Sequence, residues 1–274
     1  MKPALKAGVI GWPIEHSLSP RLHEFWLKKY GIEGSYVPLA VPPEKLERVL
    51  RDLPKQGFRG ANLTIPHKEA ALNIVDRIDP AAARIGAVNT VIVGADGKLE
   101  GRNTDAYGFS RNLLAAGFKP RGAAVVLGAG GAARAVATAL GEMGVTEIRI
   151  VNRTVERAEM LVKQLKIDAR IFAWNNYREA FLGAGLLVNA TSLGMQKEPT
   201  LDIALDGLPR DAVVTDLVYA PLTTALLAEA QKRGHKTVDG LGMLLHQARP
   251  AFEAFFGRDP EVTDELRRYV LEGK

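Results

Sequence analysis

The sequence predicts a two-domain α/β protein, because strand-like and helix-like segments alternate along almost all of its 274 residues. A domain typically takes roughly 100–200 residues, so this length suits two domains. A composition of 47% hydrophobic and 24% charged residues is ordinary for a globular protein with buried cores. Alternation of this kind is typical of mainly parallel sheets whose strands are connected by helices.

The first half of the chain contains three apolar runs that are typical of strands, at residues 7–11, 36–41 and 60–65. Proline is favoured in the first turn of a helix, which predicts helices after Ser19, after Pro42 and over residues 66–78. Two further runs flank an Asp96-Gly97 pair, and Asp-Gly is a strong signal for a hairpin formed by residues 87–93 and 99–103.

The second half repeats the alternation with six strand-like runs, at residues 123–127, 147–151, 169–172, 186–190, 213–217 and 236–238. From Leu241 onward the chain is predicted to be helical, because apolar residues recur at the spacing of one buried face. We place the boundaries near Asp105 and Gly242. Residues 1–105 then form a substrate domain, residues 106–242 a cofactor domain, and the last helices, residues 243–274, return to the first.

Charge and cysteine content exclude several classes of protein. The formal charge of +5 comes from 36 Lys and Arg against 31 Asp and Glu, scattered along helical patterns rather than gathered in a basic block, which argues against nucleic-acid binding. No apolar run approaches the ~18 residues of a membrane helix, and the first residues lack a signal-peptide pattern. Without cysteine no disulfide is needed, so the reducing cytoplasm is the default, although a chain without cysteine fits any compartment. The histidines lack other zinc ligands nearby in the sequence, so no metal is expected.

A glycine-rich turn follows the first strand of the second half. Its residues join an apolar strand to an alanine-rich helix: Gly128, Ala129, Gly130, Gly131 and Ala132. Glycines permit a tight turn and close approach to a pyrophosphate, while the helix N-terminus offers free N–H groups. The alternative is a plain structural turn. In this strand–turn–helix context, we interpret the segment as the phosphate-binding loop of a Rossmann domain.

The next strand bears on the choice of dinucleotide. NAD-binding domains usually carry an acidic residue about 20 residues beyond the glycine loop. Here the strand ends in Asn152, Arg153 and Thr154, with Arg157 one helical turn later. Arginine can pair with a 2′-phosphate, so the sequence favours NADP. The alternative is an ordinary helix start, with Thr154 as its N-cap and the arginines solvated.

Two hydroxyls lie close together in the segment before the first helix, at Ser17 and Ser19. In an extended segment they point to the same side, so both can donate to one carboxylate. Helix capping by Ser19 is the alternative, but it leaves Ser17 unexplained.

The strand at residues 60–65 leads to Lys68, with Asn62 and Thr64 expected on one face of the strand. A cation in the first turn of the predicted helix opposes the helix dipole, which favours the neutral amine needed by a general acid or base. An ordinary solvated lysine is the alternative.

Asp105 precedes a predicted helix and can be a simple N-cap or the charged partner of Lys68. Asn89 adds an amide near the start of the hairpin. Tyr219, Met243 and Gln247 taken singly suit a core or surface position as well as a functional one.

The order of these segments resembles the shikimate dehydrogenase family over nearly the whole chain. The resemblance lies in HSLSP at 16–20, GANLTIPHK at 60–68, GAVNT at 86–90, NTD at 103–105, GAGGAA at 128–133, NRT at 152–154, NATSLGM at 189–195, YAPLT at 219–223 and GLGMLLHQ at 240–247. Each motif is modest alone, and their order together is specific.

The resemblance implies a role for each matching residue. Lys68 would be the catalytic acid and base, with Asp105 as its partner. Ser17 and Ser19 would hold the substrate carboxylate with Tyr219 nearby, while Thr64, Asn89, Asp105 and Gln247 would bind ring hydroxyls, and Asn62 belongs to the same substrate group. The glycine loop and residues 152–157 would hold NADP, and the nicotinamide side would be lined by Thr191, Ser192, Met195, Leu217, Gly240 and Met243.

The expected reaction is reversible NADPH-dependent reduction of 3-dehydroshikimate to shikimate, in a monomer or homodimer. The alternatives are a quinate/shikimate or amino-shikimate dehydrogenase of the same fold, a non-catalytic NADP-binding regulator, and an unrelated Rossmann reductase. The presence of both Lys68 and Asp105 argues against the regulator, and the Ser17/Ser19 pair argues against the unrelated reductase.

Overall fold

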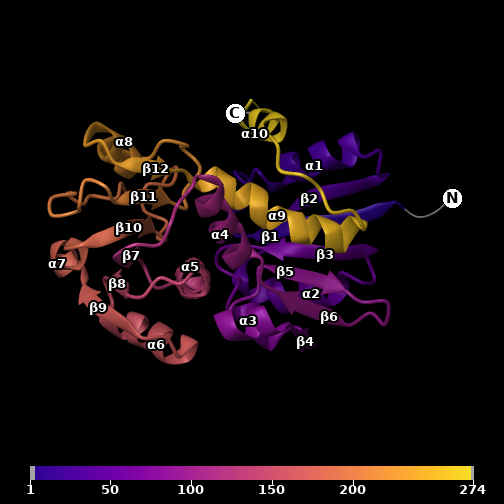
Figure 1. Cartoon of the computed structure of the whole chain (residues 1–274). Helices are drawn as coiled ribbons and strands as arrows, with labels where there is room; N and C mark the ends of the chain where they lie inside the picture. Colours follow the sequence, from indigo (N-terminus) through magenta and orange to yellow (C-terminus); the bar gives the residue numbers. More distant parts are fainter. Residues whose placement is uncertain (1–3, 273–274) are drawn as a thin grey trace. The chain divides into compact units, whose positions relative to one another are not determined.

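A computed structural model describes residues 4–272 and divides the chain into two compact units (Figure 1). Residues 1–3 and 273–274 of the predicted first domain lie outside the described part. Unit 1 holds the described residues up to Thr104 and those from Leu245 onward, and unit 2 holds Asp105–Leu244. Within residues 4–272, no helix is both long and apolar enough to cross a membrane.

Unit 1 is built on a mixed six-stranded sheet with the order β2-β1-β3-β5-β6-β4. Its strands are β1 (Leu5–Gly11), β2 (Gly34–Ala40), β3 (Phe58–Leu63), β4 (Arg77–Ile78), β5 (Thr90–Val93) and β6 (Leu99–Arg102). The β1 pairings with β2 and β3 are parallel, as is β4 with β6, whereas β5 runs antiparallel to both β3 and β6. The predicted hairpin is therefore present as β5 and β6.

The helices of unit 1 include segments from both ends of the chain. They are α1 (Ser19–Lys29), α2 (Leu46–Asp52) after the 3₁₀ turn η1 (Pro43–Lys45), η2 (Ala70–Asn73), α3 (Pro80–Ile85), the later part of α9 (Gly240–Phe256), and α10 (Asp264–Leu271). The Trp26 indole donates to the Glu261 carbonyl at 3.0 Å, and the Arg21 guanidinium donates to the Tyr269 carbonyl at 2.6 Å. These bonds tie the C-terminal segment to α1, so the final helices belong to this unit.

The predicted helix over residues 66–78 is wrong. After β3 the chain makes turns, a single 3₁₀ turn at η2 and the short strand β4. Backbone groups that follow β3 bond residues distant in the sequence: the Thr64 N–H donates to the Ile10 carbonyl, and the Lys68 carbonyl accepts from the Val88 N–H. Lys68 therefore lies in a turn rather than in the first turn of a helix, and the dipole argument for its chemistry does not apply.

The α3 helix was missed, although its boundaries are marked in the sequence. Asp79 caps it by accepting a hydrogen bond from the Ala82 N–H at 2.6 Å, and Pro80 occupies the first helical position. Gly86 ends the helix with φ of +70°, a conformation that favours glycine.

Unit 2 contains an all-parallel sheet with the order β12-β11-β10-β7-β8-β9. Its strands are β7 (Ala123–Leu127), β8 (Ile148–Asn152), β9 (Ala169–Ala173), β10 (Ala184–Asn189), β11 (Val213–Asp216) and β12 (Lys236–Val238). Counted within the unit this is the order 6-5-4-1-2-3 of a dinucleotide-binding sheet, with the reversal between β7 and β10. The prediction of two α/β domains, the second a Rossmann domain, is confirmed.

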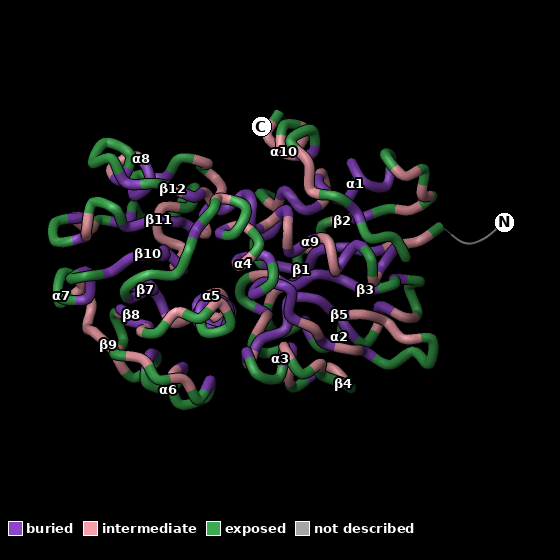
Figure 2. The backbone as a smooth tube through the Cα atoms, viewed as in Figure 1, coloured by how far each residue is buried: buried purple, intermediate pink, exposed green. Residues whose placement is uncertain are grey.

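Helices cover both faces of the sheet in unit 2. They are α4 (Asp105–Ala115), α5 (Gly131–Glu142), α6 (Val155–Leu165), α7 (Tyr177–Phe181) and α8 (Ala225–Lys232), with η3 (Trp174–Asn176) before α7. Val125 and Leu127 pack in one cluster with Phe181 and Leu227, whereas the alternate residue Val126 is equally buried outside that cluster. The strands are consequently apolar on both sides, and Figure 2 shows β7 and β10 as buried along their length.

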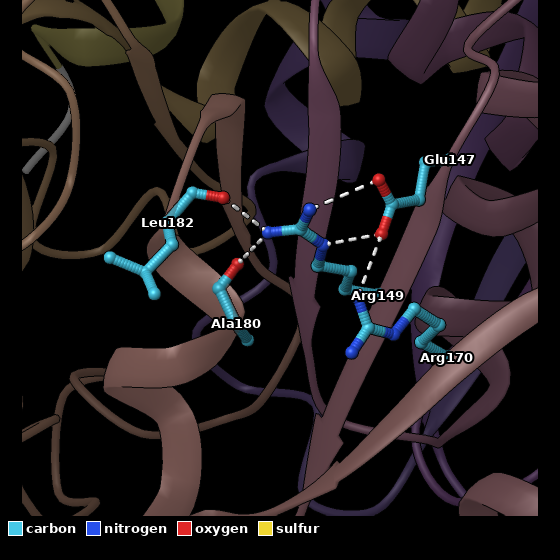
Figure 3. A network of polar contacts seen from close by, with 5 residues as sticks. All are labelled: Glu147, Arg149, Arg170, Ala180 and Leu182. Carbon is cyan, nitrogen blue, oxygen red and sulfur yellow. Dashed lines mark hydrogen bonds and ion pairs between the residues drawn. The ribbon is translucent and has the colours of Figure 1, made fainter.

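One buried guanidinium connects β8 to the end of α7 (Figure 3). Arg149 donates to both carboxylate oxygens of Glu147, at 2.8 and 3.0 Å, and to the carbonyls of Ala180 and Leu182. Hydrogen bonds from Arg149 lower the pKa of the Glu147 carboxyl. Since this charge is paired and makes four hydrogen bonds, its burial is compatible with a structural role.

A second buried polar group, His23 on α1, lacks such partners. Its ring stacks on Tyr36 with centroids 3.8 Å apart, and neither ring nitrogen has a hydrogen-bond partner among the described residues. Burial lowers the pKa of His23 from 6.5 to about 3, so the ring is neutral in the folded protein.

We predict that His23→Phe removes a pH dependence of stability. Below pH 6.5 the unfolded chain binds a proton at His23, whereas the folded chain does so only near pH 3, so falling pH favours unfolding across this window. Between pH 7 and pH 5, wild type should lose about 2 kcal/mol more unfolding free energy than the variant. Urea denaturation followed by tryptophan fluorescence measures this difference.

His67→Phe is the comparison variant: burial also lowers the pKa of His67, but its ring bonds the Val41 carbonyl at 2.8 Å, which opposes that shift, so this variant should remove a smaller part of the pH dependence. This variant should be destabilised at pH 7 by the loss of that bond. Parallel pH profiles for wild type and His23→Phe would contradict the assignment of an unpartnered neutral ring.

Candidate functional site

Strand ends gather polar residues at one edge of the sheet in unit 1. Thr64 follows β3 directly, and the segment that carries Ser17 and Ser19 follows β1, the parallel neighbour of β3. Asn89 comes just before β5. Because β5 runs antiparallel to β3, the start of β5 lies beside the end of β3, and Asn89 is also at this edge. The sheet pairing alone therefore brings together segments from three parts of the first 90 residues.

Asn89 is the centre of a buried hydrogen-bond network at this edge. Its side-chain amide donates to Thr104 Oγ1 at 2.9 Å and to Gln247 Oε1 at 3.3 Å, and its Oδ1 accepts from the Thr104 N–H at 2.8 Å. The Thr90 hydroxyl donates to the same oxygen at 3.0 Å. The structure thus brings the predicted pair Asn89 and Gln247 into direct contact.

Asn62 extends this network into the core. Its Oδ1 accepts from the Tyr36 hydroxyl at 2.7 Å, and its amide donates to Thr90 Oγ1 at 2.9 Å and to the Asn89 carbonyl at 3.2 Å. Burial raises the pKa of Tyr36, which keeps its hydroxyl as the proton donor. These bonds suit Asn62 to orienting Asn89 and Thr90.

The Ser17 and Ser19 segment differs from the expectation. It is a turn rather than an extended segment, and Leu18 occupies the N-cap position of α1 with helical dihedral angles. Ser19 is the first helical residue, and Ser17 Oγ accepts its backbone N–H at 3.3 Å. Capping by Ser19 is therefore wrong, and Ser17 is the residue that bonds the start of the helix.

The remaining predicted substrate residues fall in two units. Lys68 and Thr64 are half-buried members of unit 1, whereas Asp105, the buried first residue of α4, and Tyr219 belong to unit 2. Asp105 starts the helix rather than preceding it, so the N-cap alternative is not supported. The pairing of Lys68 with Asp105 stays a prediction.

The glycine turn of unit 2 lies at the reversal point of its sheet. Gly128 has φ of +106°, and a Cβ there would lie 3.0 Å from Thr191 Cγ2, so both backbone and space require glycine. Gly130 is the N-cap of α5, and no atom lies within 4 Å of where its Cβ would be. The start of α5 therefore combines exposed N–H groups with an open approach, which fits a phosphate.

The residues predicted to contact the adenosine follow β8. Asn152 ends the strand and donates to the Thr154 carbonyl at 2.7 Å, and Thr154 is the N-cap of α6 without a side-chain cap bond. Arg153 and Arg157 are exposed, and no described residue forms an ion pair with either of them. Gly128 N–H bonds the Val151 carbonyl at 2.8 Å, which places this segment next to the glycine turn.

The residues predicted for the nicotinamide side belong to the loops after β10 and β11 and to the start of α9. Thr191 contacts the glycine turn, and Leu217 N–H bonds the Asn189 carbonyl at 3.0 Å. A side chain at Gly240 would overlap the Leu217 carbonyl, so these two backbones touch. Ser192 is half-buried, Met195 is exposed and Met243 is buried.

Sequence reasoning missed several polar residues that hold these sites together. They are Tyr36, Thr90 and Thr104 in unit 1, and Asn189, Asp216 and Thr224 in unit 2. A usable signal existed for Asp216, since an acidic residue at the end of a buried apolar strand demands a partner. Among residues 4–272, no group of three or more His, Asp or Glu side chains could hold a metal ion.

Family models match three segments of the chain. The shikimate dehydrogenase substrate-binding domain matches residues 9–91, shikimate/quinate 5-dehydrogenase matches residues 118–199, and the shikimate 5′-dehydrogenase C-terminal domain matches residues 240–264. The NADP⁺-dependent shikimate dehydrogenase of Paramagnetospirillum magneticum is 57% identical over 97% of this chain and 97% of its own length. The chain belongs to the shikimate dehydrogenase family. The resemblance predicted from the motifs is confirmed.

Solved structures of shikimate dehydrogenases agree with this assignment over the full length. The enzyme of Thermus thermophilus, in complex with NADP(H) and shikimate, is 42% identical with a TM-score of 0.88, covering 98% of this chain and 100% of that one. A quinate dehydrogenase of Corynebacterium glutamicum in complex with NAD has a TM-score of 0.90 at 31% identity, covering 98% and 99%. The fold is thus common to shikimate and quinate dehydrogenases, and the higher identity lies with the former.

Proposed function

We infer that this chain is an NADP-dependent oxidoreductase that reversibly reduces 3-dehydroshikimate to shikimate, a step in aromatic amino acid biosynthesis. The observation that carries the inference is the 57% identity to a shikimate dehydrogenase over 97% of both chains. The polar networks around Asn89 and the open glycine turn give the same activity a structural basis. We further propose that the protein is a monomer or homodimer and that it works in the cytoplasm; the absence of cysteine agrees with a reducing compartment.

The residues of unit 2 fit NADP. The N–H groups at the start of α5 and the open position at Gly130 suit the pyrophosphate, and Arg153 and Arg157 suit a 2′-phosphate. When bound, the cofactor supplies the hydride for the ring carbonyl. The Thr191–Met195 segment, Leu217, Gly240 and Met243 would lie on the nicotinamide side.

The residues of unit 1 provide groups for a hydroxylated carboxylic acid. Ser17 and Ser19 can donate to the carboxylate, with Tyr219 as a further donor, and Thr64, Asn89 and Gln247 can bond ring hydroxyls. The amide of Asn89 is held by four side-chain and backbone bonds, so its orientation is set before substrate arrives.

Proton transfer is assigned to Lys68, with Asp105 as its charged partner. In the reduction, the Lys68 ammonium would give a proton to the ring oxygen, and in the oxidation the neutral amine would take that proton from the alcohol. Asp105 also bonds the substrate hydroxyl in this proposal. Thr104, which is fixed by Asn89, directly precedes Asp105 in the chain.

Removal of the amine should abolish most of the turnover. We expect Lys68→Ala to lower kcat for shikimate oxidation by about two to four orders of magnitude. Substrate affinity, measured by calorimetry, should change much less, because other residues hold the ring. Lys55→Ala, a loss of an exposed lysine in the same unit, is the control, and near-normal turnover by Lys68→Ala would remove this residue from its role.

Removal of one arginine should alter the choice between cofactors. We expect Arg153→Ala to lower kcat/KM for NADPH by about tenfold or more, because a charge-assisted bond to a phosphate is lost, while the value for NADH stays near wild type. The exposed Arg170 provides the control variant Arg170→Ala. An unchanged ratio of NADPH to NADH would refute the contact with the 2′-phosphate.

The two glycines of the turn should respond differently to alanine. Gly130→Ala should keep the unfolding free energy within about 0.5 kcal/mol of wild type, since its Cβ meets nothing, yet weaken NADP⁺ binding because the side chain occupies the approach to the phosphates. Gly128→Ala should itself lose about 1–3 kcal/mol of stability through its positive φ. Denaturation and cofactor titration of both variants measure these effects, and normal NADP⁺ affinity in Gly130→Ala would count against a pyrophosphate at this turn.

A turnover assay at 340 nm with shikimate and quinate, each with NADP⁺ and NAD⁺, tests the function as a whole. Shikimate with NADP⁺ should be the best pair. Faster turnover of quinate than of shikimate would favour a quinate dehydrogenase. No turnover of either substrate would favour a dinucleotide-binding protein without catalytic activity.

A further inference from the structure

A buried amide–carboxylate pair joins the ends of two central strands in unit 2. Asn189 is the last residue of β10, Asp216 is the last residue of β11, and the two are register partners in the parallel sheet. Asn189 Nδ2 donates to Asp216 Oδ1 at 2.9 Å. Both residues have 0% exposure, so this contact is closed to water.

The amide of Asn189 sets the shape of the loop after β10. Its Oδ1 accepts two hydrogen bonds from Thr191, from the backbone N–H at 3.0 Å and from the hydroxyl at 2.7 Å. Its Nδ2 also donates to the Leu193 carbonyl at 3.1 Å, and the Leu193 N–H returns to Thr191 Oγ1 at 3.1 Å. One side chain thus bonds two residues of this loop, Thr191 and Leu193.

The carboxylate of Asp216 does the same for the loop after β11. Its Oδ1 accepts from the Val218 N–H at 2.9 Å, and its Oδ2 accepts from the Thr224 hydroxyl at 2.7 Å. Thr224 is the N-cap of α8, and its hydroxyl accepts the Leu227 N–H at 3.3 Å. Asp216 therefore fixes both the beginning of the loop and the helix at its far end.

The two loops also touch each other. The Gln196 N–H donates to the Ala220 carbonyl at 2.9 Å, and the Leu217 N–H donates to the Asn189 carbonyl at 3.0 Å. Because Thr191 lies against Gly128, the pair connects the glycine turn to both loops through one continuous set of contacts.

A buried carboxylate is a costly way to hold a fold. No ion pair to Asp216 exists among the described residues, and burial raises its pKa to about 6 despite bonds from Thr224, Val218 and Asn189. An apolar residue would complete a strand of this kind at less cost. What Asp216 supplies that an apolar residue cannot is three directed acceptor contacts, which define the path of the loop.

We propose that Asn189 and Asp216 are positioning residues, whose pairing holds the loops after β10 and β11 in the shape that receives the nicotinamide half of the dinucleotide. This rests on the proposed function, in which Thr191, Ser192, Met195 and Leu217 line that half. The adenosine half, assigned to α5 and the end of β8, does not depend on the pair.

The test separates the two halves of the cofactor. For Asp216→Ala, we expect NADP⁺ affinity to fall by about tenfold or more, and kcat by up to about 100-fold, because displaced loops no longer orient the reacting ring. Affinity for adenosine 2′,5′-bisphosphate, which lacks the nicotinamide, should stay within about twofold of wild type. Calorimetry with both ligands measures this split.

Companion variants keep the test decisive if Asp216→Ala folds poorly. Thr224→Val removes a single hydroxyl contact and should show the same split to a smaller degree. Asp216→Asn keeps one acceptor oxygen and should recover part of the loss. The control is Thr215→Val, which removes an equally buried hydrogen bond, to the Val238 carbonyl, from the preceding residue of β11 and should leave both affinities unchanged.

Hydrogen exchange in the protein without cofactor provides a readout independent of catalysis. Residues 190–196 and 217–224 should exchange faster in Asp216→Ala, whereas residues 128–134 should not. Asn189→Ala combined with Asp216→Ala should lose less NADP⁺ affinity than the sum of the single variants, because both break the same contact.

Equal weakening of NADP⁺ and the bisphosphate, or no weakening of either, would overturn the proposal, as would an Asp216→Asn variant as impaired as Asp216→Ala. Failure of the proposed function looks different: wild type would then bind both ligands normally but give no turnover with shikimate at 340 nm.

Discussion

Parallel strand pairing is the constraint on which both candidate sites depend. Parallel neighbours end at the same edge of a sheet, so each unit collects the segments that follow its strands at one place. In unit 1 this edge receives the segments after β1 and β3 and the residue before β5. In unit 2 it receives the glycine turn, the end of β8 and the loops after β10 and β11. Chemistry can therefore change through these segments while the apolar strands stay the same.

At each edge, one amide side chain organises the polar groups around it. Asn89 joins Thr90, Thr104 and Gln247 in unit 1, and Asn189 joins Thr191, Leu193 and Asp216 in unit 2. An asparagine amide offers donors and acceptors on one short, rigid group, so it can hold several backbone segments without introducing a charge. The His23 ring differs from these bonded amides, since it is buried against aromatic rings and neither of its nitrogens has a hydrogen-bond partner among the described residues.

Local patterns predicted much of the architecture and failed where tertiary bonds replace local ones. The strands of unit 2 are found within a residue or two of their expected positions, because apolar runs between turns define them well. Residues 66–78 were predicted to be a helix, but the Lys68 carbonyl accepts from Val88, the Asp76 N–H donates to Leu99, and the His67 ring bonds Val41. Such partners are distant in sequence and leave no periodic signal. The α3 helix, with Asp79, Pro80 and Gly86 at its ends, was predictable and was missed.

The sequence by itself determined the α/β class, the Rossmann half and the family, because periodicity, turn chemistry and ordered motifs are local properties. Only the tertiary structure decided which residues meet. Asn89 and Gln247 lie 158 positions apart in the chain, and Asn189 and Asp216 meet through strand register alone. Contacts of this kind depend on how sheets and helices pack, and packing is set by the whole chain rather than by any one segment of it.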